Sequence, residues 1–587
     1  MINEVSQFVL GINAFHEDSS AAIIHNGKVI CAIEEERLTR VKHWSGFPIE
    51  SIKRCLRDAN IDIKQVEHIA INHDPKANLF QKIKFLLINQ PYKLISKSVN
   101  RLKTKTSVLE FLKNELGQDL NNNTKLHFVE HHLAHLSSSF LCSNFDSAVC
   151  VSVDGFGDFS SSVWGIANAD NTIKVHQKVF FPHSLGILYE AITQFLGFQS
   201  YGDEYKVMGM TSYGTPKFKG KLSKLVEFKG SKFRLNLDYF VHHIEQIEIK
   251  TDDGSLKRGN LFSKRLVDLL GPPRKPNEKI TQRHIDIAAS LQYVYEDIFF
   301  KFLNSISQNY NTKNLCLSGG CAMNSLANGK IEERTNFKNI YIPPAPGDSG
   351  GAIGAALFIS SKIKNYRKHY LDNAYLGPKL DKKEIDEVLI NAKLRTDFIV
   401  RNFKNDNDLS SFLAKEISKG KIIGWYQGRM EFGPRALGNR SIIGDPRNPK
   451  MKDLLNTKIK LRETFRPFAP SILEGEVSNW FEKVCHVPFM SRVFKIRTEK
   501  QKLIPAVTHN DGTGRLQTVA KKTNDKFYRL IEAFYSLTGV PILLNTSFNE
   551  NEPIVSSPKE AYSTFSRTKM DILVLNNEVV MRVDEIG

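Results

Sequence analysis

A strand, turn and hairpin unit that occurs twice constrains the fold of this chain most. The first copy spans residues 8–33, where an apolar run leads into the polar turn HEDSS and then into two apolar runs on either side of Asn26-Gly27. An Asn-Gly pair between apolar runs is typical of a β-hairpin. The second copy spans residues 148–175: its apolar run ends at Asp154, the turn GFGD follows, and a hairpin turns near Asp170. We predict an internally duplicated α/β domain; chance similarity of two hairpins is the alternative.

Two further junctions between a strand and a helix follow in the same region. Residues 315–324 read LCLSGGCAMN, a short apolar run and a double glycine before a helical pattern. This arrangement lets backbone amides approach a nucleotide at a helix N-terminus, although an ordinary tight turn is the alternative. A strand predicted at 339–342 leads to the sequence PPAPGDSGG. Asp348 therefore lies between a strand end and a helix start, where open α/β sheets place ligands.

The sequence EHHLAH places two histidines four residues apart. If a helix begins there, His131 and His135 lie on one face. Such a pair can bind a metal ion when carboxylates come from elsewhere in the fold, and Asp154, at a strand end, is a candidate. Surface or capping histidines are the alternative.

The second half of the chain contains a stretch rich in arginine and lysine. A polar segment at residues 362–382 marks a domain boundary, and residues 428–473 then carry ten Lys or Arg against four Asp or Glu. Glycines, prolines and aromatics flank these arginines, which favours guanidinium groups held in place for an anion. A solvated surface or a nucleic-acid stripe is the alternative. The run at 470–473 predicts a buried strand directly after Arg466, and an Arg beside a buried strand requires an anionic partner.

Composition limits the remaining possibilities. The chain has 587 residues, 41% of them hydrophobic, and a net charge of +18, which favours anionic ligands. Seven cysteines without a CxxC pair indicate reduced, buried thiols. The sequence shows no signal peptide and no membrane-spanning apolar run, so we expect a soluble cytoplasmic protein. Residues 79–116 are Lys-rich with spaced apolar residues, which predicts a helical insertion, with an amphipathic membrane-surface helix as the alternative.

Motifs along nearly the whole chain resemble those of the carbamoyltransferase family of nodulation and antibiotic-tailoring enzymes. The motifs are HEDSSAA, EEERLTRVKHWSGFP, EHHLAH, VSVDGFGD, GDEYKVMGM, SGGCAMN, PAPGDSGGAIGAA, GRMEFGPRALGNRSI, FRPFAPSIL, DGTGRLQT and LLNTSFNENEPIV. The resemblance implies a duplicated actin-like domain at residues 1–365, related to threonylcarbamoyl transferases. A linker at 366–382 and a YrdC-like domain at 383–587 would follow.

The resemblance also implies a reaction. Carbamoyl phosphate and ATP, with Mg²⁺, would form carbamoyl adenylate and pyrophosphate. The N-terminal domain would then transfer the carbamoyl group to a hydroxyl of a small-molecule acceptor, a sugar or a natural product. A homodimer is compatible with this scheme, and no nucleic-acid partner is expected.

Site residues follow from the motifs of the resemblance. Fe(II) or a similar divalent ion would be held by His131, His135, Asp154 and Asp348. The nucleotide would contact Gly319, Gly320, Asn324 and Lys206. The phosphate-binding set would be Arg435, Lys460, Arg466 and Arg515, with Asn545 as a neutral donor. His16 or Asp18 would be the general base by position, the alternative being that HEDSS is only a hydrogen-bonded turn.

Three other classes remain open on sequence grounds. A tRNA threonylcarbamoylating enzyme would use similar domains and suits the positive charge. A hydrogenase-maturation carbamoyltransferase should carry an acylphosphatase-like segment and CxxC zinc fingers, which the sequence lacks. A nucleic-acid-binding or regulatory actin-fold protein would have no use for the scattered His and Asp set.

Overall fold

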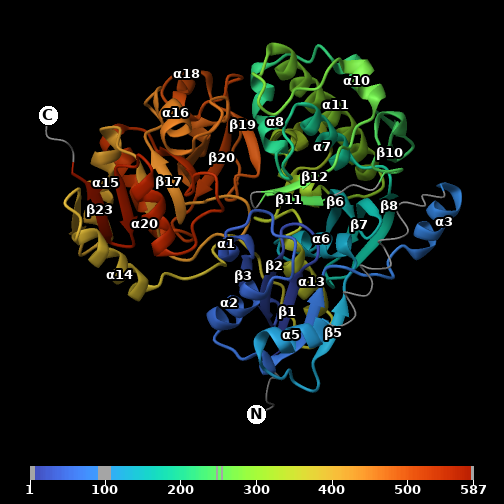
Figure 1. Cartoon of the computed structure of the whole chain (residues 1–587), viewed down its shortest axis with the longest axis horizontal. Coiled ribbons are helices and arrows are strands. Elements are labelled where there is room, and N and C mark those ends of the chain that lie inside the picture. Colours follow the sequence, from blue (N-terminus) through green and yellow to red (C-terminus); the bar gives the residue numbers. More distant parts are fainter. Residues whose placement is uncertain (1–6, 90–107, 246–248, 253–254, 584–587) are drawn as a thin grey trace. The chain divides into compact units, whose positions relative to one another are not determined.

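The computed structural model describes residues 7–89, 108–245, 249–252 and 255–583. The chain divides into two compact units, Met1–Leu371 (unit 1) and Asp372–Gly587 (unit 2) (Figure 1). The division falls inside the predicted linker, residues 366–382. Each unit has its own sheets and its own core, so each is described by itself.

Unit 1 contains two five-stranded sheets with the same topology. The first has the order β3-β2-β1-β4-β5, and the second has the order β8-β7-β6-β13-β14. In each, the first three strands along the chain pair antiparallel and the last two add in parallel. The strands are β1 (Phe8–Asn13), β2 (Ser20–His25), β3 (Lys28–Glu34), β4 (Val66–Ile71), β5 (Lys125–Phe128), β6 (Ala148–Gly157), β7 (Ser160–Ala167), β8 (Ile173–Phe180), β13 (Asn314–Ser318) and β14 (Asn339–Tyr341). The predicted duplication is confirmed.

Two helices pack between these sheets. Helix α13 (Gly350–Ser360) lies on β1, β2 and β4, helix α6 (His131–Phe140) lies on β6 and β13, and the two helices contact each other. Glycines permit the close approach: a Cβ at Gly11 would lie 1.9 Å from the Ala352 carbonyl oxygen, and one at Gly354 would lie 1.9 Å from that of Ala134. The N-termini of both helices thereby come close to the end of β6.

Further helices and hairpins complete unit 1. Helix α7 contacts β6, and α11 brings Phe302 against Trp164 of β7 with ring centroids 5.0 Å apart. The remaining elements are α1 (Glu36–Thr39), α2 (Ile49–Ala59), α3 (Leu79–Asn89), α5 (Val108–Leu116), α7 (Leu185–Phe195), α8 (Glu204–Met210), α9 (Lys219–Leu222), β9 (Val226–Lys229), β10 (Lys232–Leu235), β11 (Ile249–Asp252), β12 (Ser255–Arg258), α10 (Lys264–Leu270), α11 (Gln282–Ser307) and α12 (Ser325–Arg334). The predicted insertion at 79–116 begins and ends in helices; residues 90–107 lie outside the described part.

Unit 2 is built on one nine-stranded mixed sheet with the order β15-β23-β22-β16-β17-β21-β18-β20-β19. Its strands are β15 (Phe398–Asn402), β16 (Ile423–Tyr426), β17 (Arg440–Gly444), β18 (Ala469–Leu473), β19 (Arg492–Lys495), β20 (Thr513–Val519), β21 (Ile542–Ser547), β22 (Ile572–Leu575) and β23 (Glu578–Arg582). The longer helices are α14 (Lys382–Lys393), α15 (Asp406–Ser418), α19 (Asp525–Thr538) and α20 (Pro558–Arg567). Every residue of β18 is buried, which confirms the strand predicted at 470–473.

Both units therefore have the predicted α/β class. The actin-like and YrdC-like assignments of the two units remain expectations of the sequence resemblance. The described cysteines are free thiols, most of them buried, as predicted. Among the helices of the described residues, none is long and apolar enough to cross a membrane.

Candidate metal centre and anion-binding cluster

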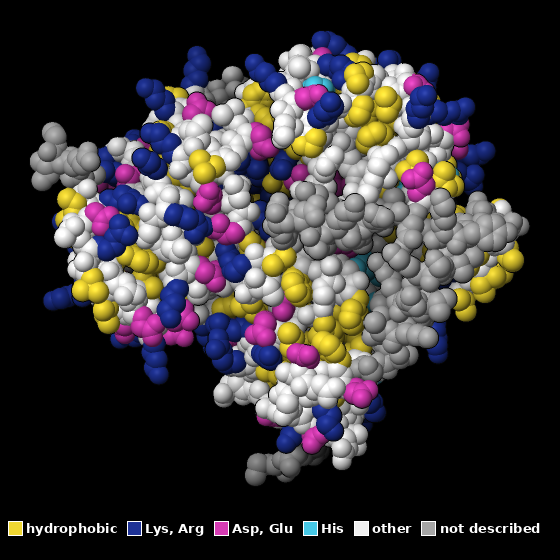
Figure 2. Space-filling model, in the orientation of Figure 1, with side chains coloured by type: hydrophobic (Ala, Val, Ile, Leu, Met, Phe, Trp, Pro, Cys, Tyr) yellow, Lys and Arg dark blue, Asp and Glu magenta, His cyan; other side chains and the backbone are white. Residues whose placement is uncertain are grey.

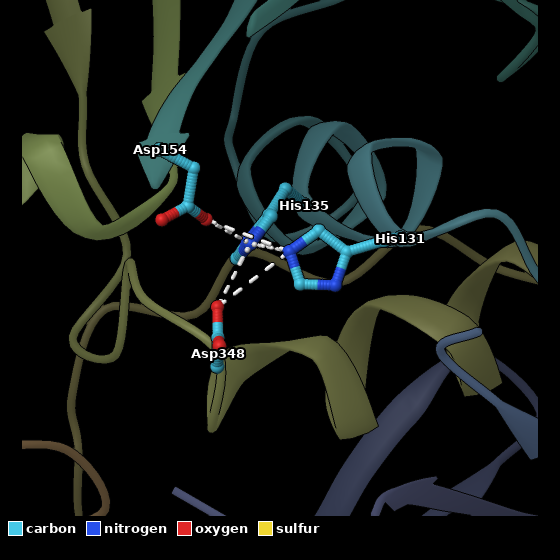
Figure 3. A group of neighbouring side chains, drawn as sticks. All are labelled: His131, His135, Asp154 and Asp348. Atoms are coloured by element: carbon cyan, nitrogen blue, oxygen red, sulfur yellow. Dashed lines mark hydrogen bonds and ion pairs between the residues drawn. The ribbon is translucent and has the colours of Figure 1, made fainter. Parts of the chain in front are cut away.

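Four side chains from three segments of unit 1 converge on one point (Figure 3). His131 and His135 lie in the first turns of α6, Asp154 lies near the end of β6, and Asp348 lies just before α13. One ligand atom of each lies within 4.8 Å of the others. Glu130 caps α6 by accepting a hydrogen bond from the Leu133 amide at 2.8 Å, so the helix begins at His131, as the sequence predicts.

The arrangement of the four groups fits a cation better than it fits hydrogen bonding. The Nε2 atoms of His131 and His135 face each other at 3.0 Å. His135 Nε2 lies 2.8 Å from Asp154 Oδ2, yet this buried oxygen has no hydrogen-bond partner among the described residues. Two imidazole nitrogens and two carboxylate oxygens suit a divalent transition metal ion such as Fe(II) or Zn²⁺.

The pKa shifts of the cluster also indicate a site for a cation. Burial lowers the pKa of His135, but Asp154 and Asp348 raise it to about 9. Burial raises the pKa of Asp154, whereas the rings of His131 and His135 bring it well below its usual range. The two carboxylates therefore stabilise a positive charge at this point. In the protein alone, protons on the imidazole rings carry that charge, and a bound metal ion would carry it instead.

Residues around the cluster fix His131 in place. A Cβ at Gly157 would lie 2.0 Å from a carbon of the His131 ring, so glycine leaves the space that this ring fills. The Asp158 carboxylate accepts a hydrogen bond from the His131 amide at 2.9 Å and pairs with His73 at 2.5 Å. Asp158 is not among the predicted site residues, although it is the last residue of the VSVDGFGD motif. Asp158 therefore holds the His131 backbone in place where α6 begins, and it is not one of the four candidate ligands.

The two candidates for the general base lie in different surroundings. His16 Nδ1 is 3.3 Å from Asp348 Oδ2, and its ring packs edge-on against His131 with centroids 5.4 Å apart. The Asp18 carboxylate instead pairs with His43 Nδ1 at 2.7 Å. The structure therefore brings His16 to the cluster, whereas Asp18 pairs with His43 of the loop between α1 and α2.

The double-glycine loop lies directly against the metal-ligand cluster. Gly319 has a φ of +85°, and a Cβ there would be 2.3 Å from the Val153 carbonyl oxygen; a Cβ at Gly320 would be 2.9 Å from Asp154 Oδ1. The other two nucleotide candidates have partners within the fold. Asn324 exchanges two hydrogen bonds with Gln292, and Lys206 pairs with Asp203 at 2.8 Å.

In unit 2, three arginines lie within electrostatic range of Arg515. Burial lowers the pKa of Arg515 well below its usual range, and the charges of Arg435, Arg462 and Arg466 lower it further. The buried Nε of Arg515 has no hydrogen-bond partner among the described residues. We call these four residues the arginine cluster. The sequence predicted three of them; Arg462 was missed as an individual residue, although it lies in the basic stretch.

Lys460 and Asn545, the other two residues of the predicted phosphate site, form hydrogen bonds within unit 2. The Lys460 side chain is buried, and its ammonium donates to the carbonyl and side-chain oxygens of Asn549 at 2.8 and 2.6 Å. The Asn545 amide nitrogen donates to Gln517 Oε1 at 2.9 Å and to Ser471 Oγ at 3.1 Å. Buried amide groups inside a sheet bond to their neighbours in this way, and the role of Asn545 as a donor to phosphate stays a prediction.

The chain matches two family models that together cover most of its length. Residues 8–357 match "Carbamoyltransferase N-terminus", and residues 414–582 match "Carbamoyltransferase C-terminus". The chain belongs to the carbamoyltransferase family. The chain is also similar to the following three proteins along most of its length. "Nodulation protein NolNO" of Sinorhizobium fredii is 36% identical, over 97% of this chain and 80% of that protein. "Nodulation protein NolO" of Bradyrhizobium diazoefficiens is 38% identical, over 77% and 79%. The uncharacterized protein sll1178 of Synechocystis is 38% identical, over 98% and 96%.

Solved structures resemble this carbamoyltransferase-family chain only weakly. The crystal structure of T. kodakarensis HypF has a TM-score of 0.30 and 14% sequence identity, over 62% of this chain and 48% of that one. The family models support a carbamoyl-transfer reaction.

Proposed function

We propose that this chain is an ATP-dependent O-carbamoyltransferase with two half-reactions, one in each unit. Unit 2 forms carbamoyl adenylate from carbamoyl phosphate and ATP, and unit 1 transfers the carbamoyl group to a hydroxyl of a small molecule. The observation that carries the proposal is the arginine cluster, because four neighbouring guanidinium groups, one of them buried with an unpaired Nε, call for a polyanionic ligand.

The arginine cluster suits the first half-reaction. Carbamoyl phosphate and ATP are both polyanions, so fixed cations offset their repulsion and stabilise the charge that moves to the leaving group. Water cleaves carbamoyl phosphate to carbamate and phosphate. A carbamate oxygen then attacks the α-phosphorus of ATP, and pyrophosphate leaves with the electrons of the broken P–O bond; Mg²⁺ would supply charge neutralisation for these phosphates. Arg435, Arg462, Arg466 and Arg515 would bind the phosphate oxygens of these species.

The cluster in unit 1 suits the second half-reaction. His131, His135, Asp154 and Asp348 would hold a divalent ion, which when bound supplies Lewis-acid polarisation. The acceptor oxygen forms a bond to the carbamoyl carbon, and AMP leaves with the electrons of the bond that breaks. His16, beside Asp348, takes the hydroxyl proton on a ring nitrogen. The double-glycine loop, next to Asp154, would bind the adenylate through backbone amides at the junction of a strand and a helix.

The test measures the two half-reactions separately in the full-length protein. With ATP and carbamoyl phosphate but no acceptor, we expect pyrophosphate release that requires carbamoyl phosphate. Pyrophosphate release at the same rate without carbamoyl phosphate would contradict the proposal. Carbamoylation of a hydroxyl acceptor, followed with labelled carbamoyl phosphate, then identifies the substrate.

A further inference from the structure

Helix α3 (Leu79–Asn89) of unit 1 presents an unusual number of large apolar side chains to solvent. Phe80 is 75% exposed and Leu87 is 72% exposed. The other exposed apolar residues of the helix are Leu79, Ile83, Leu86 and Ile88. Figure 2 shows yellow side chains at the right edge of the molecule, where Figure 1 places α3. An exposed group of this size is typical of an interaction surface.

Five of these six exposed residues share one side of the helix, whereas Ile88 lies toward the other side. Successive residues of an α-helix are about 100° apart around its axis. On this spacing an apolar arc of about 120° contains Leu79, Phe80, Ile83, Leu86 and Leu87. Lys82 and Lys84 flank the arc on its two sides. Phe85 lies on the opposite side and packs against Phe159 and Phe181, with ring centroids 5.8 and 5.0 Å away. The helix is therefore attached to the body through one face while its apolar face points outward.

The charge around α3 selects the kind of partner. The described residues 75–89 contain three Lys and no Asp or Glu. An apolar helix face flanked by lysines is the pattern of helices that lie in the interface of an anionic membrane. Two copies of the same face would bring like charges together, so self-association fits this surface less well.

We propose that α3 docks unit 1 on an anionic lipid bilayer. The helix lies in the plane of the interface, with Phe80, Ile83 and Leu87 inserted at the boundary between headgroups and acyl chains. Lys82 and Lys84, which flank the apolar arc, contact lipid phosphates. This surface is separate from the metal-ligand cluster, and the proposal stands whether or not the proposed reaction is correct.

The experiment compares binding of the full-length protein to vesicles of phosphatidylcholine alone and of phosphatidylcholine with phosphatidylglycerol. In co-sedimentation, we expect the wild type to partition onto the anionic vesicles about tenfold more strongly. The double variant Phe80→Glu/Leu87→Glu should lower partitioning onto the anionic vesicles by about tenfold or more, because each change removes an inserted apolar side chain and adds a repelled charge.

A matched control uses two exposed apolar residues of unit 2. Ile390 and Leu394 are 61% and 79% exposed, so Ile390→Glu/Leu394→Glu adds the same charge to a comparable surface and should leave vesicle binding unchanged. Because the substituted residues are exposed in both variants, melting temperatures should stay close to the wild type. Failure of the wild type to bind anionic vesicles, or equal binding by Phe80→Glu/Leu87→Glu, would overturn the proposal. So would a wild-type dimer that this variant converts to a monomer without a change in vesicle binding.

Discussion

Removing one arginine from the cluster in unit 2 should stabilise the ligand-free protein while abolishing its response to polyanions. The residue is Arg515 on β20, whose pKa is lowered first by burial and then by three neighbouring guanidinium groups. A lowered pKa of a cation means that the fold disfavours its charged form. Arg515→Gln removes the buried charge and keeps a polar side chain of intermediate length.

The magnitude follows from the burial and the unpaired donor. A buried donor left without a partner costs about 1–3 kcal/mol of stability. Arg515→Gln removes this cost, but the shorter side chain packs less well and offsets part of the gain. We expect a net gain of about 1 kcal/mol without ligand, which corresponds to about 2–4 °C for a unit of this size. Pyrophosphate at a hundredfold excess over its Kd should stabilise the wild type by about 2.7 kcal/mol, and the variant by much less.

The assay is thermal unfolding of the full-length protein with and without pyrophosphate, and the order of the two melting temperatures should reverse on addition of the ligand. The matched control is Arg447→Gln. Arg447 lies in the basic stretch 428–473, as the other three arginines of the cluster do, but its guanidinium pairs with Asp445 at 2.7 Å. The control should therefore melt slightly below the wild type and keep the full pyrophosphate response. An Arg515→Gln protein that is less stable than the wild type without ligand and still responds fully to pyrophosphate would refute the reasoning.

Three further predictions concern unit 1. Asp348→Ala should abolish carbamoyl transfer and tight divalent-metal binding but leave pyrophosphate release intact; equal loss of both half-reactions in a folded protein would argue against separate sites. Gly157→Ala should lower metal affinity by about tenfold or more, measured by titration calorimetry, because the new Cβ would lie 2.0 Å from the His131 ring; unchanged affinity would count against the assigned ligand. Burial lowers the pKa of His43, but Asp18 and Glu36 raise it to about 9. A raised pKa stabilises the fold below about pH 6.5, and this contribution is lost as the pH rises through about 9. The unfolding free energy of the wild type relative to His43→Gln should therefore fall over that window by about 1–2 kcal/mol, discounted because 29% of the imidazole side chain is exposed; a difference that does not vary with pH would contradict the assignment.

Short-range patterns in the sequence determined the elements of this fold. The Asn26-Gly27 turn, the four-residue spacing of His131 and His135, and the apolar run of β18 each specify local structure through turn chemistry or periodicity, and each prediction is confirmed. The repeated strand, turn and hairpin unit likewise corresponds to the three antiparallel strands of each sheet, β1–β3 and β6–β8.

Only the tertiary structure decided which polar groups meet. Asp18 and His16 stand two residues apart in one turn, yet one pairs with His43 and the other approaches Asp348. Asn545 bonds within its sheet, and Asp158 holds the start of α6. The physical reason is range: a hairpin or a helix face depends on residues a few positions apart, whereas the partner of a buried charge depends on which distant strands and helices pack beside it. Because burying an unpaired charge is costly, a buried charged group needs a partner, but that partner can come from any part of the sequence.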